Sequence, residues 1–475
     1  MNNKYSDLIK KQYKEFQSLK TRPLNFRIQA LEKLLDVIKK NELKIIESLN
    51  KDLGKSETES YLTEIGPTYT EIRDHIKNLK KWSKPKKIKT PITLFPGKSY
   101  TVYEPYGNTL IISPWNYPFQ LAIIPLVGAI SGGNTAIVKP SELSPHTSEV
   151  LREIINSTFD EDYIKVVLGD VDDTNELLKE RFDFIFFTGS SNVGKIIMNK
   201  ASTNLTPVVL ELGGKSPVII DKDCNISLSA KRVAFGKVMN AGQTCVAPDY
   251  ILVHENRYYE FVAEFKKNLE AFFSISDYMD ENRNISNYAG LCKIISEKHY
   301  KRAVEMLNGE DVILGGRYDD DTNKIEPTLI NSGYINDYLK ENKSISKVME
   351  EEIFSPLLPI IRYNDINDCI EYINKNEKPL SLYIFSSNQE IISKVTNSIS
   401  YGGGCINDTL VQLANPNLPF GGVGNSGMGK YHGKFSFYTF SHEKSIFKNS
   451  TIIDLAVRYL PYTKLKLRLL KKLMK

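Results

Sequence analysis

The hydrophobic pattern changes twice in the first quarter of the chain. Up to about Trp82, apolar residues recur at three- and four-residue spacing on a polar background, as at Leu31, Leu34 and Leu35. This spacing predicts two or three amphipathic helices. Residues 83–105 turn to proline, lysine, threonine and β-formers, which predicts extended arms or hairpin strands outside the main core.

From residue 109 to residue 212, short apolar runs alternate with helical segments. Such alternation predicts a parallel, doubly wound sheet that binds ligands at the carboxyl ends of its strands. The strands are expected at Thr109–Ser113, Thr135–Val138, Ile164–Leu168, Phe184–Phe187 and Val208–Leu212, and the helices near Phe119–Ser131, from Pro145 with Ser144 as N-cap, near Thr174–Lys179 and near Asn192–Lys200.

A second block of mixed helices and strands runs from Ser216 to about Ser400 and predicts a second α/β domain. Residues 401–440 are rich in glycine, asparagine, proline and phenylalanine, and we expect this loop-like, apolar segment to pack against other protein. In the second block, helices are expected at Arg257–Phe273 and Ser296–Leu307, and strands at Tyr250–Val253, Leu357–Arg362 and Leu380–Phe385.

Composition narrows the class of protein. A chain of 475 residues with 41% apolar and 25% charged residues is typical of a soluble globular protein of two or three domains. Its five cysteines are far apart and contain no C-x-x-C motif, so we expect neither disulfides nor a cysteine zinc site, and a reducing compartment. The six histidines form no H-E-x-x-H motif, which leaves little basis for a catalytic metal.

Charge and hydropathy exclude two further classes. The net charge is +5, but residues 464–475 carry six basic side chains and no acid, so the rest of the chain sums to about −1. A nucleic-acid-binding body would need basic residues clustered over a folded face. The N-terminus lacks an apolar signal core, and the longest apolar stretch (Leu121–Ile130) is broken by Pro125, so we expect no membrane span, no export signal and a cytoplasmic location.

Two side chains point to chemistry. Glu211 ends an apolar, strand-like run, and Cys245 lies in a loop of glycine, alanine and proline, so an acid–base group and a nucleophile share one stretch of chain. The alternatives are a solvent-facing acid and an inert, core-like cysteine. The pair Gly213-Gly214 predicts a bend where the backbone clears something, and Gly242 is expected to let the backbone approach a ligand.

Two turns add candidate binding groups. The turn Phe187–Gly194 follows a strand and begins a helix, where backbone N–H groups and the helix dipole can hold a phosphate. Such turns are also common as purely structural connections between a strand and a helix. Asn116 follows the strand Thr109–Ser113, and its amide is placed to donate to an oxyanion or simply to shape a turn.

Together these motifs resemble the aldehyde dehydrogenase superfamily, specifically its class three, fatty-aldehyde type. The resemblance spans about residues 5–460. It implies an α/β fold with a Rossmann-type doubly wound cofactor domain, a second α/β catalytic domain and a small β oligomerisation arm. The motifs are PWNYPF (114–119), KPSE (139–142), FTGS (187–190), LELGGKSP (210–217), GQTC (242–245), EEIFSP (351–356) and the long segment 407–445.

The resemblance also implies domain boundaries. They are 1–83 and 105–211 for the cofactor domain, 212–402 for the catalytic domain, 84–104 and 403–445 for the oligomerisation arm, and 446–475 for a basic amphipathic tail. The arm suggests a homodimer.

The resemblance assigns a role to each motif residue. Cys245 would be the nucleophile, Asn116 the oxyanion donor and Glu211 the base that activates water, with NAD or NADP as cofactor and no metal. Two positions depart from the family pattern: Ser355, where glycine is usual, and Ala241, where this class often has cysteine. The remaining contacts implied are Lys139, Glu142, Gly189, Ser190, Glu352 and Phe354 for the cofactor and Tyr117 for the substrate.

The expected function is NAD(P)-dependent oxidation of hydrophobic aldehydes to carboxylic acids through a cysteine thioester. The alternatives are a CoA-acylating relative and a non-catalytic binding protein on the same scaffold. Residues 462–475 place leucines on one helical face, which predicts a helix on an anionic membrane or over a substrate funnel, or one docked on its own body or on a dimer partner.

Overall fold

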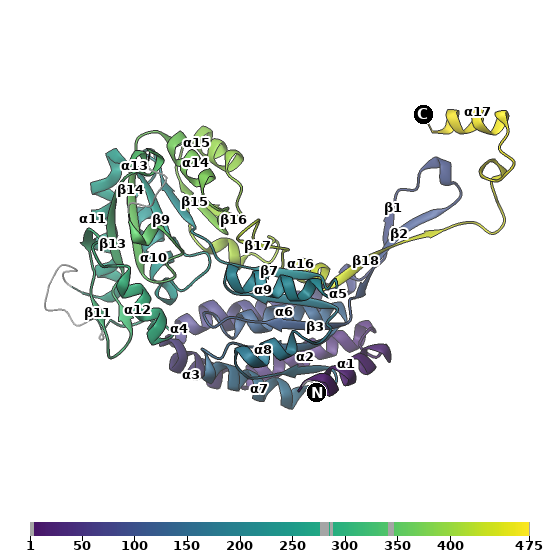
Figure 1. The fold of residues 1–475 in the computed structure, drawn as a ribbon, viewed down its shortest axis with the longest axis horizontal. Coiled ribbons are helices and arrows are strands. Elements are labelled where there is room, and N and C mark those ends of the chain that lie inside the picture. Colours follow the sequence, from purple (N-terminus) through teal and green to yellow (C-terminus); the bar gives the residue numbers. More distant parts are fainter. Residues whose placement is uncertain (1–3, 276–284, 286–287, 341–345, 475) are drawn as a thin grey trace.

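The computed structural model describes residues 4–275, 285, 288–340 and 346–474 (Figure 1). The N-terminal region forms five α-helices and one π-helical turn, more than the two or three predicted. Short breaks explain the difference, since Gly54 ends one helix in the left-handed conformation and Gly66 begins another. The helices are α1 (Ser6–Gln17), α2 (Leu24–Lys40), α3 (Glu42–Leu53), α4 (Glu57–Ser60) and α5 (Gly66–Trp82), with the π-turn η1 (Tyr61–Ile65) between the last two.

The predicted parallel sheet is present, with strand order β17-β7-β6-β3-β4-β5. Helices cover both faces, because Ile111 packs into one apolar cluster while Leu110 and Ile112 pack into another. The order reverses between β3 and β6, which is where a doubly wound sheet opens a crevice for a ligand. The strands are β3 (Asn108–Ile112), β4 (Thr135–Lys139), β5 (Ile164–Val166), β6 (Phe184–Thr188), β7 (Val208–Glu211) and the antiparallel β17 (Gly427–Met428). The helices are α6 (Gln120–Gly132), α7 (Pro145–Thr158), α8 (Val171–Leu177) and α9 (Ser191–Ser202).

The second α/β unit is a seven-stranded sheet with its own apolar core, in the order β10-β13-β14-β9-β8-β15-β16. Its strands are β8 (Pro217–Ile220), β9 (Tyr250–His254), β10 (Val312–Leu314), β13 (Thr328–Tyr334), β14 (Leu357–Tyr363), β15 (Ser381–Phe385) and β16 (Gly403–Ile406). Its helices are α10 (Ile226–Val238), α11 (Tyr258–Phe273), α12 (Glu297–Glu305), α13 (Ile335–Lys340), α14 (Ile366–Lys375) and α15 (Gln389–Ser398), and β11 (Tyr318–Asp319) and β12 (Lys324–Ile325) form a separate ribbon.

A third, three-stranded sheet projects from the body as an arm (Figure 1). It consists of β1 (Lys86–Ile88), β2 (Lys98–Pro105) and β18 (Ser441–Lys448), and β18 pairs antiparallel with the whole of β2. The last helix, α17 (Lys464–Leu473), lies beyond the arm, and none of its residues is buried.

The prediction that 403–445 belongs to the arm is wrong for most of that range. Residues 403–406 form β16, which pairs with β15 in the seven-stranded sheet, while β17 pairs with β7 in the six-stranded sheet. The glycines that suggested a loop allow close strand packing, because a Cβ on Gly404 would lie 2.0 Å from the Leu382 carbonyl oxygen. The arm strand begins only at Ser441.

Within the described residues, no helix has both the length and the hydropathy needed to span a bilayer. The same part of the chain contains no group of three or more His, Cys, Asp or Glu side chains arranged to hold a metal ion.

Candidate active site

A cavity of about 320 Å³ lies between the two large sheets, at the carboxyl ends of β3, β6 and β7. It is the site where the doubly wound topology predicts a ligand. Seven of the ten candidate residues line it: Asn116, Gly189, Ser190, Glu211, Cys245, Glu352 and Phe354.

Cys245 is partly exposed on the wall of this cavity. Burial raises the pKa of its thiol to about 12, and the carboxylates of Glu352 and Glu211 add to the increase. The thiol is therefore protonated in the cofactor-free protein at neutral pH and lies within electrostatic reach of two acids.

A strained turn leads into the cysteine. Asn240, Ala241 and Gly242 have φ values of 50°, 50° and 72°, in the left-handed region that non-glycine residues avoid. Gly242, where we expected the backbone to approach a ligand, packs closely against protein: a Cβ there would lie 2.3 Å from the Ser355 carbonyl oxygen.

Glu211 ends β7 and is 3% exposed. Neither of its carboxylate oxygens has a hydrogen-bond partner among the described residues, although both are inaccessible to solvent. Burial alone raises the pKa of this carboxyl well above its usual range. A buried, unpaired acid beside a thiol is the arrangement expected of a general base.

Asn116 is held by hydrogen bonds of its side-chain amide and of its backbone carbonyl. Its side-chain amide donates to the Gln243 carbonyl at 3.1 Å, which uses one of the two N–H groups of that nitrogen. Its own carbonyl accepts from the Asn240 amide at 2.8 Å and from the Lys55 ammonium at 3.1 Å. The amide is thus fixed at the cavity wall beside the Cys245 loop.

Glu352 explains the predicted bend at Gly213. A Cβ on Gly213 would lie 2.1 Å from Oε2 of Glu352, so glycine is needed for the carboxylate to reach the cavity. Burial raises the pKa of Glu352 to about 8, with a further contribution from Asp249.

The residues after Glu352 are held by Arg302, which donates to the carbonyl of Ile353 at 3.0 Å and also to that of Glu352. Phe354 has a φ of 50°, whereas Ser355 is outside the left-handed region, so serine fits where the family usually has glycine.

The residues around the cavity fit a dinucleotide. Gly189 and Ser190 lie at the N-terminus of α9, where backbone N–H groups and the helix dipole favour an anion. The Thr188 hydroxyl is buried at the same place without a partner among the described residues. A second cavity of about 340 Å³ shares Ser190 and Glu352 with the first, which extends the space available to a long ligand.

Three candidate residues line neither of the two cavities. Lys139 is the last residue of β4 and Glu142 follows the strand, with the Lys139 ammonium 3.8 Å from the Glu142 carboxylate. Tyr117, expected to contact the substrate, is instead buried beside the cysteine loop, its hydroxyl 2.6 Å from that of Thr244.

Trp115, His299 and Arg302 are among the side chains of the cavity wall that sequence reasoning missed. Trp115 packs against His299 and Phe354, with ring centroids 5.0 and 5.4 Å apart, and Arg302 lies one turn further along α12. Trp115 precedes Asn116 in a motif that had been noted, but nothing local marks α12 as part of the site.

A Rossmann-type sheet with an anion-binding helix end beside a cysteine and a buried acid defines a dinucleotide-dependent oxidoreductase. The chain belongs to the aldehyde dehydrogenase family, whose sequence profile matches residues 2–446. It is an oxidoreductase that oxidises aldehydes with NAD or NADP.

Several relatives cover nearly the whole chain. It is 49% identical to 4,4'-diaponeurosporen-aldehyde dehydrogenase of Staphylococcus aureus, over 94% of both chains. It is 43% identical to the dimeric NADP-preferring aldehyde dehydrogenase of Rattus norvegicus, over 96% of this chain and 97% of the relative. A substrate-bound structure of Staphylococcus aureus AldH superimposes with a TM-score of 0.94, at 46% identity and full coverage of both chains. These findings confirm the predicted family and fold.

Proposed function

We propose that the enzyme oxidises hydrophobic aldehydes to carboxylic acids through a covalent adduct on Cys245. The observation that carries this proposal is that Cys245, Glu211 and Asn116 line one cavity, although Asn116 is far from the other two in sequence. Each supplies a different function that acyl chemistry needs: a nucleophile, a base and an oxyanion donor.

The proposed reaction begins when the partly exposed Cys245 thiol releases its proton to solvent and the thiolate sulfur forms a bond to the aldehyde carbon. The carbonyl oxygen becomes an oxyanion, which the Asn116 amide and the Cys245 backbone N–H stabilise by hydrogen bonds. Bound NAD(P)⁺ supplies the acceptor for the hydride that leaves this carbon.

The thioester left on Cys245 then reacts with water. Glu211 takes a proton from the water as the water oxygen attacks the acyl carbon. The carbon–sulfur bond then breaks to release the acid and the Cys245 thiolate, and the proton on Glu211 passes back to the sulfur. The raised pKa of Glu211 suits this role, because a carboxylate that binds a proton more readily is a stronger base.

The cofactor contacts carry over as part of the same proposal. Gly189 and Ser190 would hold the phosphates, Glu352 and Phe354 the nicotinamide ribose, and Lys139 and Glu142 the adenosine ribose at the end of β4. The kinetic panel described below compares NAD with NADP as the cofactor.

A hydrophobic substrate is supported by the lining of the cavity. Aromatic and aliphatic side chains form much of its wall beside the polar groups already described, a typical setting for an apolar ligand. They are Pro114, Trp115, Leu121, Leu212, Phe354, Leu380, Phe420 and Tyr431.

A kinetic panel tests the substrate class. Straight-chain aldehydes of increasing length are assayed with NAD and with NADP, and we expect kcat/KM to rise with each added methylene up to the length that the cavity accepts. A decrease from the shortest aldehyde onward would contradict a hydrophobic substrate. Cys245→Ala should abolish NADH formation, and full activity of that variant would remove the covalent route.

We also propose a homodimer formed through the β arm. The arm exposes large apolar side chains, among them Ile92, Leu94 and Phe95, which a second copy would cover. Sedimentation equilibrium should give twice the chain mass of 54.0 kDa. A monomer at micromolar concentration would exclude this assembly.

For the tail, we propose contact with an anionic membrane by an otherwise cytoplasmic enzyme. In α17 the exposed Leu465, Leu469 and Leu473 accompany basic residues, and residues 464–475 contain no acid. The full chain should co-sediment with vesicles containing phosphatidylserine, and a chain ending at Tyr462 should not. Equal behaviour of the two would exclude the contact.

The alternatives considered from sequence are not favoured. The named relatives are aldehyde dehydrogenases, and Glu211 provides a base for hydrolysis rather than transfer to CoA. Product analysis with and without CoA separates the two outcomes.

A further inference from the structure

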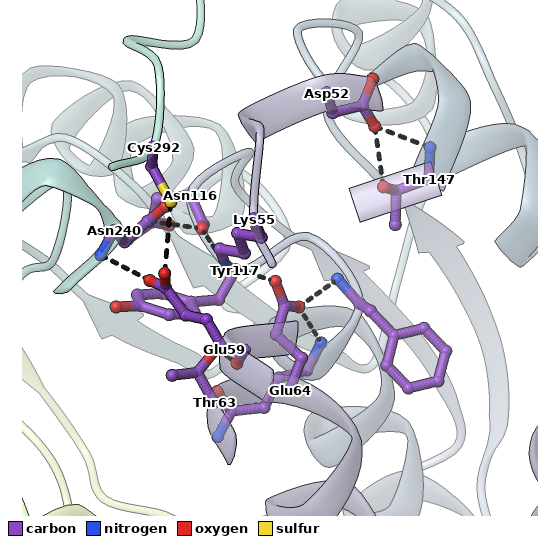
Figure 2. Close-up of polar contacts among 12 residues, drawn as sticks. Asp52, Lys55, Glu59, Thr63, Glu64, Asn116, Tyr117, Thr147, Asn240 and Cys292 are labelled. Atoms are coloured by element: carbon purple, nitrogen blue, oxygen red, sulfur yellow. Dashed lines mark hydrogen bonds and ion pairs between the residues drawn. The ribbon is translucent and has the colours of Figure 1, made fainter. Parts of the chain in front are cut away.

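Behind the wall of the active site lies a cluster of buried charges that the proposed reaction does not use (Figure 2). Lys55 and Glu64 are both 0% exposed, and the Lys55 ammonium lies 2.5 Å from Oε1 of Glu64. The other carboxylate oxygen of Glu64 accepts from the backbone N–H groups of Phe119 and Gln120, at 2.9 and 3.0 Å. The ion pair therefore joins the N-terminal helical region to the start of α6.

The same ion pair reaches the proposed oxyanion donor. The Lys55 ammonium donates to the Asn116 carbonyl and lies 4.0 Å from the centre of the Tyr117 ring. Because Lys55 fixes residue 116 and Glu64 fixes residues 119 and 120, the segment that carries the Asn116 amide is anchored at Asn116 itself and at the start of α6.

A second acid, the partly buried Glu59, holds the strained turn before the cysteine. Oε1 of Glu59 accepts the Asn240 backbone N–H at 2.6 Å, and Oε2 accepts from the Cys292 thiol at 3.4 Å. Asn240 is the first of the three left-handed residues, and the turn formed by them leads to Cys245.

The two anchors meet at one carbonyl. The side chains of Asn240 and of Asn116 both donate to the Gln243 carbonyl, each at 3.1 Å, two residues before Cys245. Figure 2 shows Lys55 and Asn240 contacting the Asn116 carbonyl, while Glu59 contacts Asn240. The relative position of the amide and the thiol therefore depends on a continuous chain of hydrogen bonds that begins at Lys55 and Glu59.

Stability alone is a poor explanation for this arrangement. A buried ion pair is often no more stabilising than well-packed apolar residues of similar volume, because removing two charges from water is expensive. Non-glycine residues in left-handed conformations are also unfavourable, and such backbone strain is found at sites where geometry matters. Here the buried ion pair and the strained turn both contact the segments that carry Asn116 and Cys245, so they fix the geometry around these two residues.

We infer that Lys55 and Glu59 are positioning residues of the aldehyde oxidation, Lys55 by fixing the Asn116 main chain and Glu59 by fixing the turn before Cys245. Neither lines the cavity. The inference rests on the roles proposed for Asn116 and Cys245. A misplacement of about 1 Å at such groups can reduce a rate by about 100-fold.

The test compares Glu59→Ala with Glu59→Gln, which keeps an oxygen acceptor for the Asn240 N–H, and with Lys55→Met as an independent break of the network. Asp52→Ala is the matched control: Asp52 is buried and accepts the Thr147 N–H at 2.8 Å at the start of α7 (Figure 2), and it does not line the cavity. For each variant, kcat, the KM for NAD(P) and the thermal midpoint are measured.

A second readout is independent of turnover. Iodoacetamide alkylation of Cys245 in the cofactor-free protein, followed by mass spectrometry of its peptide, reports the environment of the thiol. Glu59→Ala should change this rate at least threefold and reduce kcat about 10- to 100-fold, with the KM for NAD(P) within twofold. Lys55→Met should reduce kcat to a similar extent and leave the alkylation rate unchanged, since Lys55 acts on Asn116.

Glu59→Gln should restore most of the kcat lost in Glu59→Ala, and Asp52→Ala should lose thermal stability but keep kcat per folded molecule. The inference is overturned if kcat in the Glu59 and Lys55 variants follows thermal stability along the same line as Asp52→Ala. Should Glu59→Ala fail to fold, Glu59→Gln and Lys55→Met still test the inference. A wild-type kcat in Lys55→Met refutes it, as does a Glu59→Gln variant that is as inactive as Cys245→Ala. Activity in Cys245→Ala would instead refute the proposed function.

Discussion

Glu211→Gln should separate the two halves of the proposed reaction. Glutamine has nearly the same shape, and β7 pairs with β17 through the main chain, so we expect the fold to be unchanged. What is lost is the ability to take a proton from water. A positioned general base contributes about 10²–10⁴-fold to a rate, and Glu211 is the one acid on the cavity wall whose two oxygens have no partner among the described residues. Steady-state turnover should therefore fall by about that factor.

Oxidation itself should survive this change. In a stopped-flow experiment with saturating aldehyde and NAD(P)⁺, the variant should produce one equivalent of reduced cofactor per Cys245 and then slow to the residual hydrolysis rate. Intact-mass analysis after the burst should show Cys245 carrying the acyl group. Turnover at the wild-type rate, or a slow reaction with neither burst nor adduct, would refute the assignment of Glu211 as the base.

The pH dependence gives a second check on the same residue. A base acts only when deprotonated, and burial raises the pKa of Glu211, so the wild-type hydrolysis step should speed up with rising pH beyond the range of an ordinary carboxylate. The residual rate in Glu211→Gln should lack this rise. An equal rise in both proteins would show that another group controls it.

Three further outcomes are expected. Gly213→Ala should raise the KM for NAD(P) about 10-fold or more at similar stability, because its methyl group displaces the Glu352 carboxylate, whereas an unchanged KM would contradict the cofactor contact. Lys55→Met should lower the free energy of unfolding by about 3–5 kcal/mol, because Glu64 is left buried without its partner. The double variant Lys55→Met, Glu64→Gln should be more stable than Lys55→Met alone. A less stable double variant in thermal or urea unfolding would refute this. Alkylation of Cys245 in the cofactor-free enzyme should speed up about tenfold per pH unit from pH 7 to 9, because the thiol pKa is about 12, and a plateau below pH 9 would contradict that value.

Local pattern predicted the doubly wound sheet well, since each strand and helix between residues 109 and 212 is marked by its own apolar run and its own turn residues. The observed bounds differ from the predicted ones by a few residues, as for β5, which ends at Val166 rather than at Leu168. Ser190 shows the same local logic: its hydroxyl accepts the Val193 N–H at the start of α9, one residue earlier than the helix was expected. Where glycine-rich segments form strands, as in β16, the local pattern failed because neighbours from elsewhere in the chain supply the pairing.

By itself the sequence determined the elements of the cofactor domain and, through the family resemblance, predicted a nucleophile, a base and an oxyanion donor. These depend on short-range periodicity and on motifs of a few residues, which are written in consecutive positions. Only the tertiary structure decided that β18 completes the arm by pairing with β2, and that Lys55 and Glu59 reach Asn116 and the turn at Asn240. The physical reason is that pairing partners and buried charges are satisfied by contacts between residues up to hundreds of positions apart, for which no local pattern exists.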